Sequence, residues 1–197
     1  MAYLLGSIPC GLVLTRLFAS ADIRRSGSGN IGATNVARVA GPVLGLATLC
    51  GDFCKGWAPV ALAARLDLPP AAAAPYALVM ALLAVLGHVF PVYTGWRGGG
   101  KGVATAAGGF FGLAPPAVWI ALGVFGLVLA LTRRVSAGSL AAAAALPPAV
   151  FGATGSVVLC AGAAITAVIV FVRHADNIRR LRAGTEPPFG FGVKPDR

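Results

Sequence analysis

The feature that most constrains this chain is an almost unbroken succession of apolar stretches. Hydrophobic residues make up 57% of the 197 residues and charged residues only 11%, so the chain is more apolar and far less charged than an average soluble domain. No long polar linker or low-complexity segment separates the stretches. We therefore expect an all-α membrane protein with a single domain over residues 1–197.

Length sets how many helices such a chain can place across a bilayer. A hydrocarbon core about 30 Å thick needs about 20 apolar residues in a helix, with about 17 as a lower limit. This rule predicts about seven transmembrane helices, in the ranges 2–18, 43–64, 71–92, 103–114, 117–132, 136–152 and 155–173. The fourth is short and stops at Pro115-Pro116, so we expect a tilted or partial span there.

Basic residues alternate between the connections of these stretches. The connections after the second, fourth and sixth stretches contain only Arg65, whereas the others and the tail, which includes Lys194 and Arg197, hold nearly all remaining Lys and Arg. Cytoplasmic loops are enriched in basic residues, so we expect the N-terminus outside and the C-terminus in the cytoplasm. The net charge of +10 then suits lipid headgroups and small anions, and we expect no nucleic-acid partner.

The first polar segment, residues 22–38, lies on the predicted cytoplasmic face. Its glycines free the backbone for tight turns and close approach to a ligand. Its short side chains can form hydrogen bonds, and an arginine offers a planar cationic fork for phosphate. The candidate ligand-binding residues are Ser28, Asn30, Thr34, Asn35 and Arg38. An ordinary polar turn is the alternative interpretation.

The second polar segment joins a glycine run, Gly98, Gly99 and Gly100, to Lys101 and Gly102. Such a run before a helix can hold phosphate with backbone N–H groups, the helix N-terminus and the ammonium group. Residues 95–101 also fit the pattern G-x-x-x-x-G-K, but a P-loop needs Ser or Thr at the next position and a preceding strand. The pattern therefore indicates phosphate binding and not nucleotide hydrolysis.

The third polar segment is the tail, where His174 and Asn177 share one face of a predicted short helix on the membrane surface. Glu186 follows the glycine that ends this helix. Inside the second apolar stretch, Asp52 and Lys55 are three residues apart. Charges within a span are costly, so these two either pair structurally, line a cavity or serve function. The four cysteines lie in apolar stretches, and we expect neither a metal site nor a cofactor.

These segments resemble a known family, the acyl-phosphate-dependent glycerol-3-phosphate acyltransferases of bacterial membranes, called the PlsY family. The resemblance covers almost the whole chain, and five motifs occur in the family's order. They are Gly6-Ser-Ile-Pro-Cys-Gly11, Gly27-Ser-Gly-Asn-Ile-Gly-Ala-Thr-Asn35, Asp52-Phe-Cys-Lys-Gly56, Gly100-Lys-Gly-Val-Ala-Thr105 and His174-Ala-Asp-Asn-Ile-Arg-Arg-Leu-Arg-Ala-Gly-Thr-Glu186.

The resemblance implies transfer of a fatty acyl group from acyl phosphate to the sn-1 hydroxyl of glycerol 3-phosphate, in a monomer of the bacterial inner membrane whose active site faces the cytoplasm. It implies catalytic roles for Ser28, Arg38, His174 and Asn177. It also implies that the loop around Lys101, with Lys55 and Ser136, contacts substrate, and that Glu186 is structural. This chain departs from the family in having three glycines before Lys101 and in Ile31, where Pro is frequent.

Two questions stay open at the level of sequence. The hydroxyl proton can pass to His174, whose ordinary pKa of about 6.5 suits a base, or to a phosphate oxygen of the substrate. The chain can also be a transporter of organic phosphates or a phosphate-binding membrane protein without turnover. No internal repeat of the kind common in transporters is evident.

Overall fold

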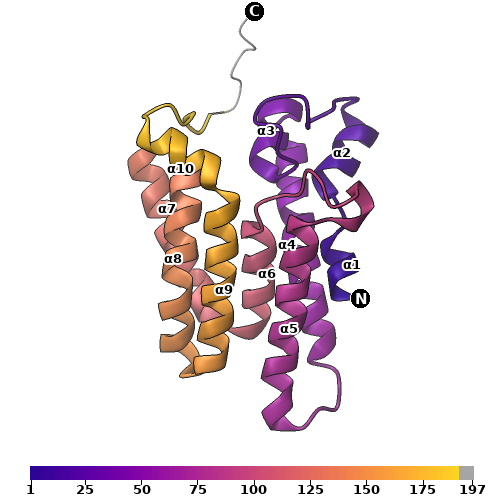
Figure 1. The fold of residues 1–197 in the computed structure, drawn as a ribbon, viewed down its shortest axis with the longest axis vertical. Helices are drawn as coiled ribbons and strands as arrows, with labels where there is room; N and C mark the ends of the chain where they lie inside the picture. Colours follow the sequence, from indigo (N-terminus) through magenta and orange to yellow (C-terminus); the bar gives the residue numbers. More distant parts are fainter. Residues whose placement is uncertain (191–197) are drawn as a thin grey trace, which may run out of the picture.

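The computed structural model describes residues 1–190; Lys194, Arg197 and the end of the predicted 1–197 domain lie outside the described residues. The described part is helical, without strands (Figure 1). Its elements are α1 (Ala2–Gly6), α2 (Cys10–Phe18), α3 (Ala33–Ala40), α4 (Pro42–Ala63), α5 (Pro70–Val89), the 3₁₀ turn η1 (Val92–Thr94), α6 (Val103–Leu113), α7 (Pro115–Thr132), α8 (Val135–Thr154), α9 (Val157–Arg173) and α10 (Ala175–Arg182). The prediction of an all-α chain is confirmed for these residues.

The helices form two groups that stand side by side, with α6 between them (Figure 1). Helix α6 packs against α4 and α5 in one group and against α7 and α9 in the other. The loop 20–32, α3 and α10 lie at the same end of the molecule, at the top of Figure 1. We call this end the polar end, because the three polar segments of the sequence meet there.

Small residues allow α4 and α6 to pack closely. A Cβ on Gly56 would lie 2.0 Å from the carbonyl oxygen of Thr105, and one on Gly108 would lie 2.0 Å from that of Phe53. Such small residues let helix backbones approach each other in membrane proteins. The contact fixes the height of α6 against α4, and therefore the position of the glycine-lysine loop that precedes α6.

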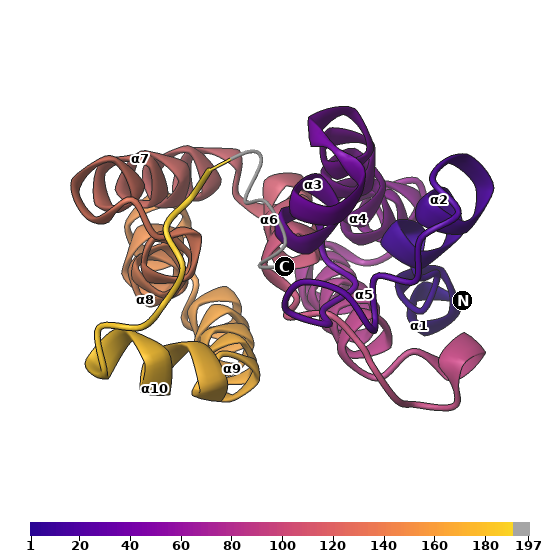
Figure 2. The ribbon, with the colours of Figure 1, turned by 90° about the horizontal axis from the view of Figure 1, so that it is seen from above.

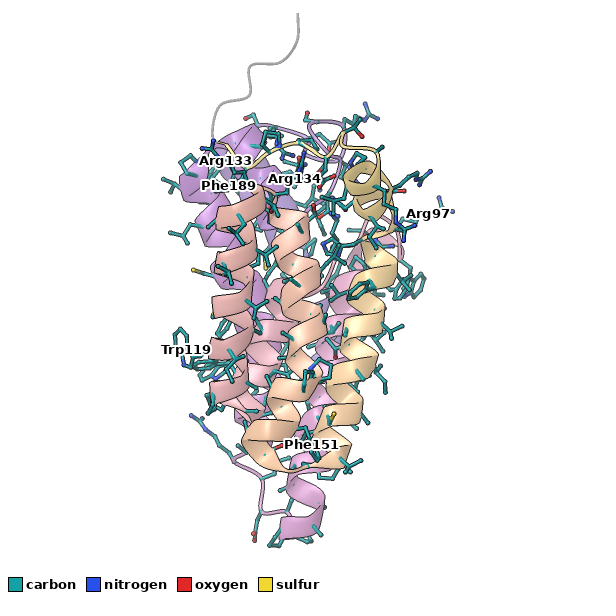
Figure 3. All side chains as sticks on the ribbon, turned by 90° about the vertical axis from the view of Figure 1, so that its left-hand side faces the viewer. Arg97, Trp119, Arg133, Arg134, Phe151 and Phe189 are labelled. Atoms are coloured by element: carbon teal, nitrogen blue, oxygen red, sulfur yellow. The ribbon has the colours of Figure 1, made fainter. Side chains whose placement is uncertain are left out.

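The outer surface of the helices is strongly apolar. Trp119 points outward from α7 (Figure 3), and large side chains such as Leu131 and Val157 are more than two-thirds exposed. A soluble monomer rarely exposes so large an apolar surface. Lipid contact explains it, and the chain is an integral membrane protein in which the apolar helices face the hydrocarbon core.

The structure supports fewer complete spans than the sequence predicts. Among the described residues, Pro70–Thr94, Pro115–Thr132 and Val135–Thr154 are long and apolar enough to cross a membrane. A fourth span results if α9 and α10, bent by 63° at their junction, are counted together. Helix α6 has 11 residues, about 16 Å at 1.5 Å per residue, so it is too short to cross alone, as expected for a partial span. The count of seven and the orientation stay predictions.

The first predicted helix, 2–18, is wrong as a continuous element. The structure breaks it into α1 and α2 at residues 7–9. Pro9 has no N–H group and disfavours helical geometry at Ile8, so the helix stops and restarts there. The Ile8 carbonyl at the break accepts a hydrogen bond from the Lys55 ammonium at 2.9 Å. A charge inside α4 thereby stabilises a backbone irregularity inside the apolar part of the molecule.

Candidate active site

The loop 20–32 is held by one buried side chain from α3. The Asn35 Oδ1 accepts a hydrogen bond from the Ser28 backbone N–H at 2.8 Å, and its Nδ2 donates to the carbonyls of Ile23 (3.0 Å) and Ser26 (3.1 Å). Gly27 has a φ of 61°, and a Cβ there would lie 2.3 Å from the Asn35 Oδ1. Asn35, expected to bind substrate, therefore fixes the loop on which Ser28 is presented.

The other predicted residues of this segment divide into supports and free groups. Asn30 closes a tight turn, since its Oδ1 accepts from the Gly32 N–H at 2.8 Å. Thr34 is exposed on α3. The Ser28 hydroxyl is exposed, and Arg38 lies half-buried in the last turn of α3. Within residues 1–190, neither of these last two side chains forms a hydrogen bond or ion pair, so both are available to a ligand.

The structure assigns separate roles to the three glycines before Lys101. A Cβ on Gly99 would lie 1.9 Å from the Val89 carbonyl oxygen, and one on Gly100 would lie 1.9 Å from the His88 Nε2. Gly98 has a φ of 66° and faces open space. Gly102, with a φ of 84°, is the N-cap of α6, so its neighbourhood offers the unpaired N–H groups of a helix N-terminus. Close packing thus requires glycine at 99 and 100, while backbone geometry alone favours it at 98.

An arginine that the sequence analysis did not single out holds this loop. The Arg173 guanidinium donates to the carbonyls of Gly99 (3.0 Å, from an Nη) and Gly100 (3.3 Å, from Nε). On the other side, the Gly100 N–H donates to the His88 carbonyl at 3.0 Å. The sequence contained one signal, because Arg173 directly precedes His174, but its partners are backbone atoms that no motif reveals.

Lys101 belongs to a connected set of polar side chains around Glu186. The Lys101 ammonium donates to the Asn177 Oδ1 at 2.5 Å, and the Asn177 Nδ2 donates to the Glu186 Oε1 at 2.6 Å. Ser136 donates to the same oxygen at 2.6 Å, and Arg180 to Oε2 at 2.7 Å. The set joins the start of α6, the start of α8, α10 and the tail. Three side chains from α8 and α10 therefore hold the Glu186 carboxylate in place.

Charge and burial shift the pKa values in this set. Burial lowers the pKa of Lys101 to about 8; Glu186 opposes this shift, and Arg180 and Arg173 add to it. For Glu186, burial raises the pKa, but hydrogen bonds from Ser136, Asn177 and Arg180 outweigh it, so the pKa lies below its ordinary value. A cation whose charge is disfavoured gains most from an added anion, so Lys101 is suited to bind a phosphate.

His174, at the junction of α9 and α10, is buried and neutral. Burial, with the nearby charge of Lys101, lowers the pKa of His174 to about 4. The His174 Nδ1 lies 2.8 Å from the Val170 carbonyl. A carbonyl only accepts, so Nδ1 carries the hydrogen and Nε2 keeps its lone pair. The imidazole can accept a hydrogen bond from a hydroxyl group through Nε2.

Asp52, Lys55 and His88 form a second buried set beneath the glycine loop. The Lys55 ammonium lies 2.9 Å from the Asp52 Oδ1, and the His88 Nδ1 lies 3.6 Å from the same oxygen. Lys55, which is predicted to contact phosphate, binds Asp52 and the Ile8 carbonyl in this structure. The His88 ring packs against Gly100, so this set connects the break between α1 and α2 to the underside of the loop.

Apart from Asp52 and Lys55, the predicted site residues form two groups at the polar end, around α10 and around α3, two helices that lie apart in the view from above (Figure 2). One is the connected set around Lys101 and Glu186. The other is the segment 22–38 with Ser28 and Arg38. Within residues 1–190, no hydrogen bond or ion pair joins the side chains of the two groups. In the same part of the chain, no three His, Cys, Asp or Glu residues are placed to hold a metal ion.

An apolar cavity of about 70 Å³ lies among α6, α7, α8 and α9. Its walls include Val103, Phe125, Leu146 and Val170, and among residues 1–190 Thr166 is the only polar side chain that lines it. Val103 follows the glycine-lysine loop, and the Val170 carbonyl is the partner of His174. The cavity therefore begins directly beside the cationic set. The arrangement places an apolar surface next to a cationic one.

The fold and the site together define a multi-helix integral membrane protein with an anion-binding polar end above an apolar cavity. The family model described as glycerol-3-phosphate acyltransferase matches residues 1–184, and the chain belongs to this family. The glycerol-3-phosphate acyltransferase of Geobacter metallireducens is 52% identical over 188 residues, which cover 95% of this chain and 94% of that protein. The enzyme of that name from Geobacter sulfurreducens is 48% identical over 189 residues, covering 96% and 94%.

Solved structures agree with this family membership. Two crystal structures of PlsY, an integral membrane glycerol 3-phosphate acyltransferase, share 36% identity with this chain and cover 96% of it and 92% of their own chain. The glycerol 3-phosphate form has a TM-score of 0.88 and the lysophosphatidic acid form one of 0.86. The fold is thus that of PlsY over almost its whole length.

Proposed function

We propose that this protein transfers a fatty acyl group from acyl phosphate to the sn-1 hydroxyl of glycerol 3-phosphate. The ester bond to the glycerol oxygen forms, the bond between the acyl carbon and the phosphate oxygen breaks, and lysophosphatidic acid and phosphate are the products. The observation that carries the proposal is the direct junction of the cationic set with the apolar cavity, at Lys101, His174, Val103 and Val170. The two forms of PlsY support the acceptor and the product.

The residues at the polar end suit the chemistry of an activated donor. Acyl phosphate is a mixed anhydride, so a covalent nucleophile of the protein is not required. The main task is to bring two anions together with the hydroxyl about 3 Å from the acyl carbon. Lys101, Arg38 and the loop N–H groups offset the repulsion between the substrates and stabilise the departing phosphate. Ser28 adds a hydroxyl with no protein partner.

The pKa of His174 bears on the question of the proton acceptor. With a pKa of about 4, His174 is a weaker base than a phosphate monoester, whose second pKa is about 6. We therefore propose that a substrate phosphate oxygen takes the hydroxyl proton. His174 accepts a hydrogen bond through Nε2 and positions the glycerol. Asn177 orients Lys101 in the same step.

The acyl chain occupies the cavity among α6 to α9 in this proposal. A tail that enters past Val103 and Val170 passes next to the reacting groups and meets Leu146 further in. Replacing Leu146 by Ala would enlarge the cavity. Competition between a shorter and a longer saturated acyl phosphate then shifts toward the longer donor. An unchanged ratio would place the acyl chain elsewhere.

We further propose that the site faces the cytoplasm of a bacterial inner membrane and that the chain acts as a monomer without a cofactor. The alternation of basic connections supports this orientation. In a cysteine-free background, a cysteine at exposed Ser28 should resist a membrane-impermeant maleimide in intact cells, while one at exposed Ala72 should react. The reverse labelling pattern would indicate the opposite orientation in the membrane.

Activity is tested with purified protein, palmitoyl phosphate and glycerol 3-phosphate, measuring lysophosphatidic acid. We expect product with acyl phosphate and none with palmitoyl-CoA, which controls for contaminating acyltransferases. The rival functions give different results. Uptake of glycerol 3-phosphate into vesicles without product indicates a transporter, and saturable binding with neither uptake nor product indicates a binding protein.

A further inference from the structure

Arg173 ends α9 and reaches across to the glycine loop, far away in the sequence. Its fork binds two consecutive carbonyls, those of Gly99 and Gly100, at 3.0 and 3.3 Å. Charge-assisted hydrogen bonds of this kind are stronger than neutral ones. No carboxylate pairs with Arg173 among the ion pairs within residues 1–190, so the backbone of the loop is its hydrogen-bonding partner there.

These two bonds determine which way the loop presents its N–H groups. In a planar trans peptide the C=O and N–H bonds point in opposite directions. With the carbonyls of Gly99 and Gly100 turned toward Arg173, the N–H groups of Gly100 and Lys101 point away from it. The Gly100 N–H is bonded to the His88 carbonyl at 3.0 Å. The loop is therefore held from both sides.

A glycine run needs such external support more than other sequences do. Glycine loses more conformational freedom on ordering than any other residue, and three glycines precede Lys101. Free carbonyls would also repel a phosphate at the same loop. The guanidinium group covers two of these negative ends and adds a positive charge near Lys101.

We propose that Arg173 is a positioning residue that orders the glycine loop before substrate arrives, so that the backbone N–H and the ammonium group of Lys101 meet the phosphate of the acceptor. The proposal rests on the proposed function for the identity of that phosphate ester. The order of the loop is a property of the protein without substrate, so this part of the proposal is independent of the proposed function.

The first test therefore uses no substrate. Hydrogen exchange of residues 98–102 is compared in detergent-solubilised wild type, Arg173→Gln and Arg173→Lys. Arg179→Lys is the matched control, because Arg179 is exposed and paired only with Asp176 on the surface. We expect about tenfold faster exchange in Arg173→Gln, the loss expected for one charge-assisted hydrogen bond, and an intermediate value for Arg173→Lys. Unchanged exchange would overturn the proposal.

The second test separates the two Michaelis constants. Arg173→Lys should raise the KM for glycerol 3-phosphate several-fold. This variant keeps the charge and most of the side chain, so it should fold even if Arg173→Gln does not. Its kcat and its KM for palmitoyl phosphate should stay within about twofold. An equal loss in all constants would contradict a role limited to the loop. If Arg173→Gln exchanges faster but the wild type has no acyltransferase activity, the positioning role stands and the proposed function is rejected.

Discussion

Two regions of the polar end differ in how much of their polar chemistry is already bound within the protein. In the interlocked region, defined as residues 98–102 with Arg173, Asn177 and Glu186, every polar side chain has a protein partner. In the open region, residues 22–38, the supports are bonded but the Ser28 hydroxyl and the Arg38 guanidinium are not. The difference indicates one surface built before substrate binds and one whose polar groups complete their bonds only with substrate.

The largest expected effect concerns the packing of the interlocked region. Gly100→Ala places a Cβ 1.9 Å from the His88 Nε2, so the loop must shift. A displacement of about 1 Å at a binding group costs about 100-fold in rate, and we expect that loss in kcat/KM. Gly95→Asn is the control, because position 95 has open space and a φ of 65° that Asn tolerates. Equal losses in both variants would show that the loop is not packed in advance.

The next effect tests the open region. Ser28→Ala should lower kcat by about 100-fold, the order measured for removal of one hydrogen bond made in a transition state. The melting temperature should not change, since no protein group loses a partner. Ser26→Ala is the matched control, because the structure uses only its backbone carbonyl. A drop in stability in the Ser28 variant would place its hydroxyl in the protein framework.

The pH dependence of acceptor binding gives a smaller effect. Lys101, with a pKa of about 8, is charged below that pH and loses its charge as the pH rises through it. The KM for glycerol 3-phosphate should therefore rise by up to about tenfold per pH unit above 8. Lys101→Arg keeps its charge at every accessible pH, so its KM should stay flat between about pH 7 and 9. The same rise in both proteins would assign the titration to another group.

The smallest effect concerns the support beneath the open region. Asn35→Ala removes three hydrogen bonds, from the Ser28 N–H and to the carbonyls of Ile23 and Ser26. Leaving such groups unpaired costs about 1–3 kcal/mol, or several degrees in melting temperature at about 2–4 °C per kcal/mol. Thr34→Ala, on the exposed side of α3, should leave the melting temperature unchanged. Equal melting temperatures for Asn35→Ala and wild type would mean that the loop is ordered by other contacts.

The long helices were predictable because proline and glycine bound their apolar stretches. The range 43–64 corresponds to Pro42–Ala63, 117–132 to Pro115–Thr132 and 136–152 to Val135–Thr154. The break at Ile8 was not predicted, because a rule based on length and hydropathy treats one proline among apolar residues as part of the span. The bond from Lys55 that accompanies the break depends on the packing of α4 against α1, which the sequence does not encode locally.

The sequence predicted which residues lie at the site better than it predicted what each residue does there. Motifs placed His174, Asn177, Lys101 and Glu186 together, and the structure joins the last three by hydrogen bonds. Asn35 has the side chain of a ligand-binding residue but bonds to backbone carbonyls, and no pattern of residue types distinguishes these uses. Arg173 escaped notice for the same reason.

The bond between the Lys55 ammonium and the Ile8 carbonyl also constrains how the protein is made. The two residues are separated by 47 positions, so Ile8 leaves the ribosome about 2–10 seconds before Lys55 at about 5–20 residues per second. During that interval the Ile8 carbonyl keeps the Cys10 N–H, 3.0 Å away, as its hydrogen-bond donor and lacks the ammonium group. The charged bond that ties the α1–α2 break to α4 therefore forms only after α4 has been synthesised.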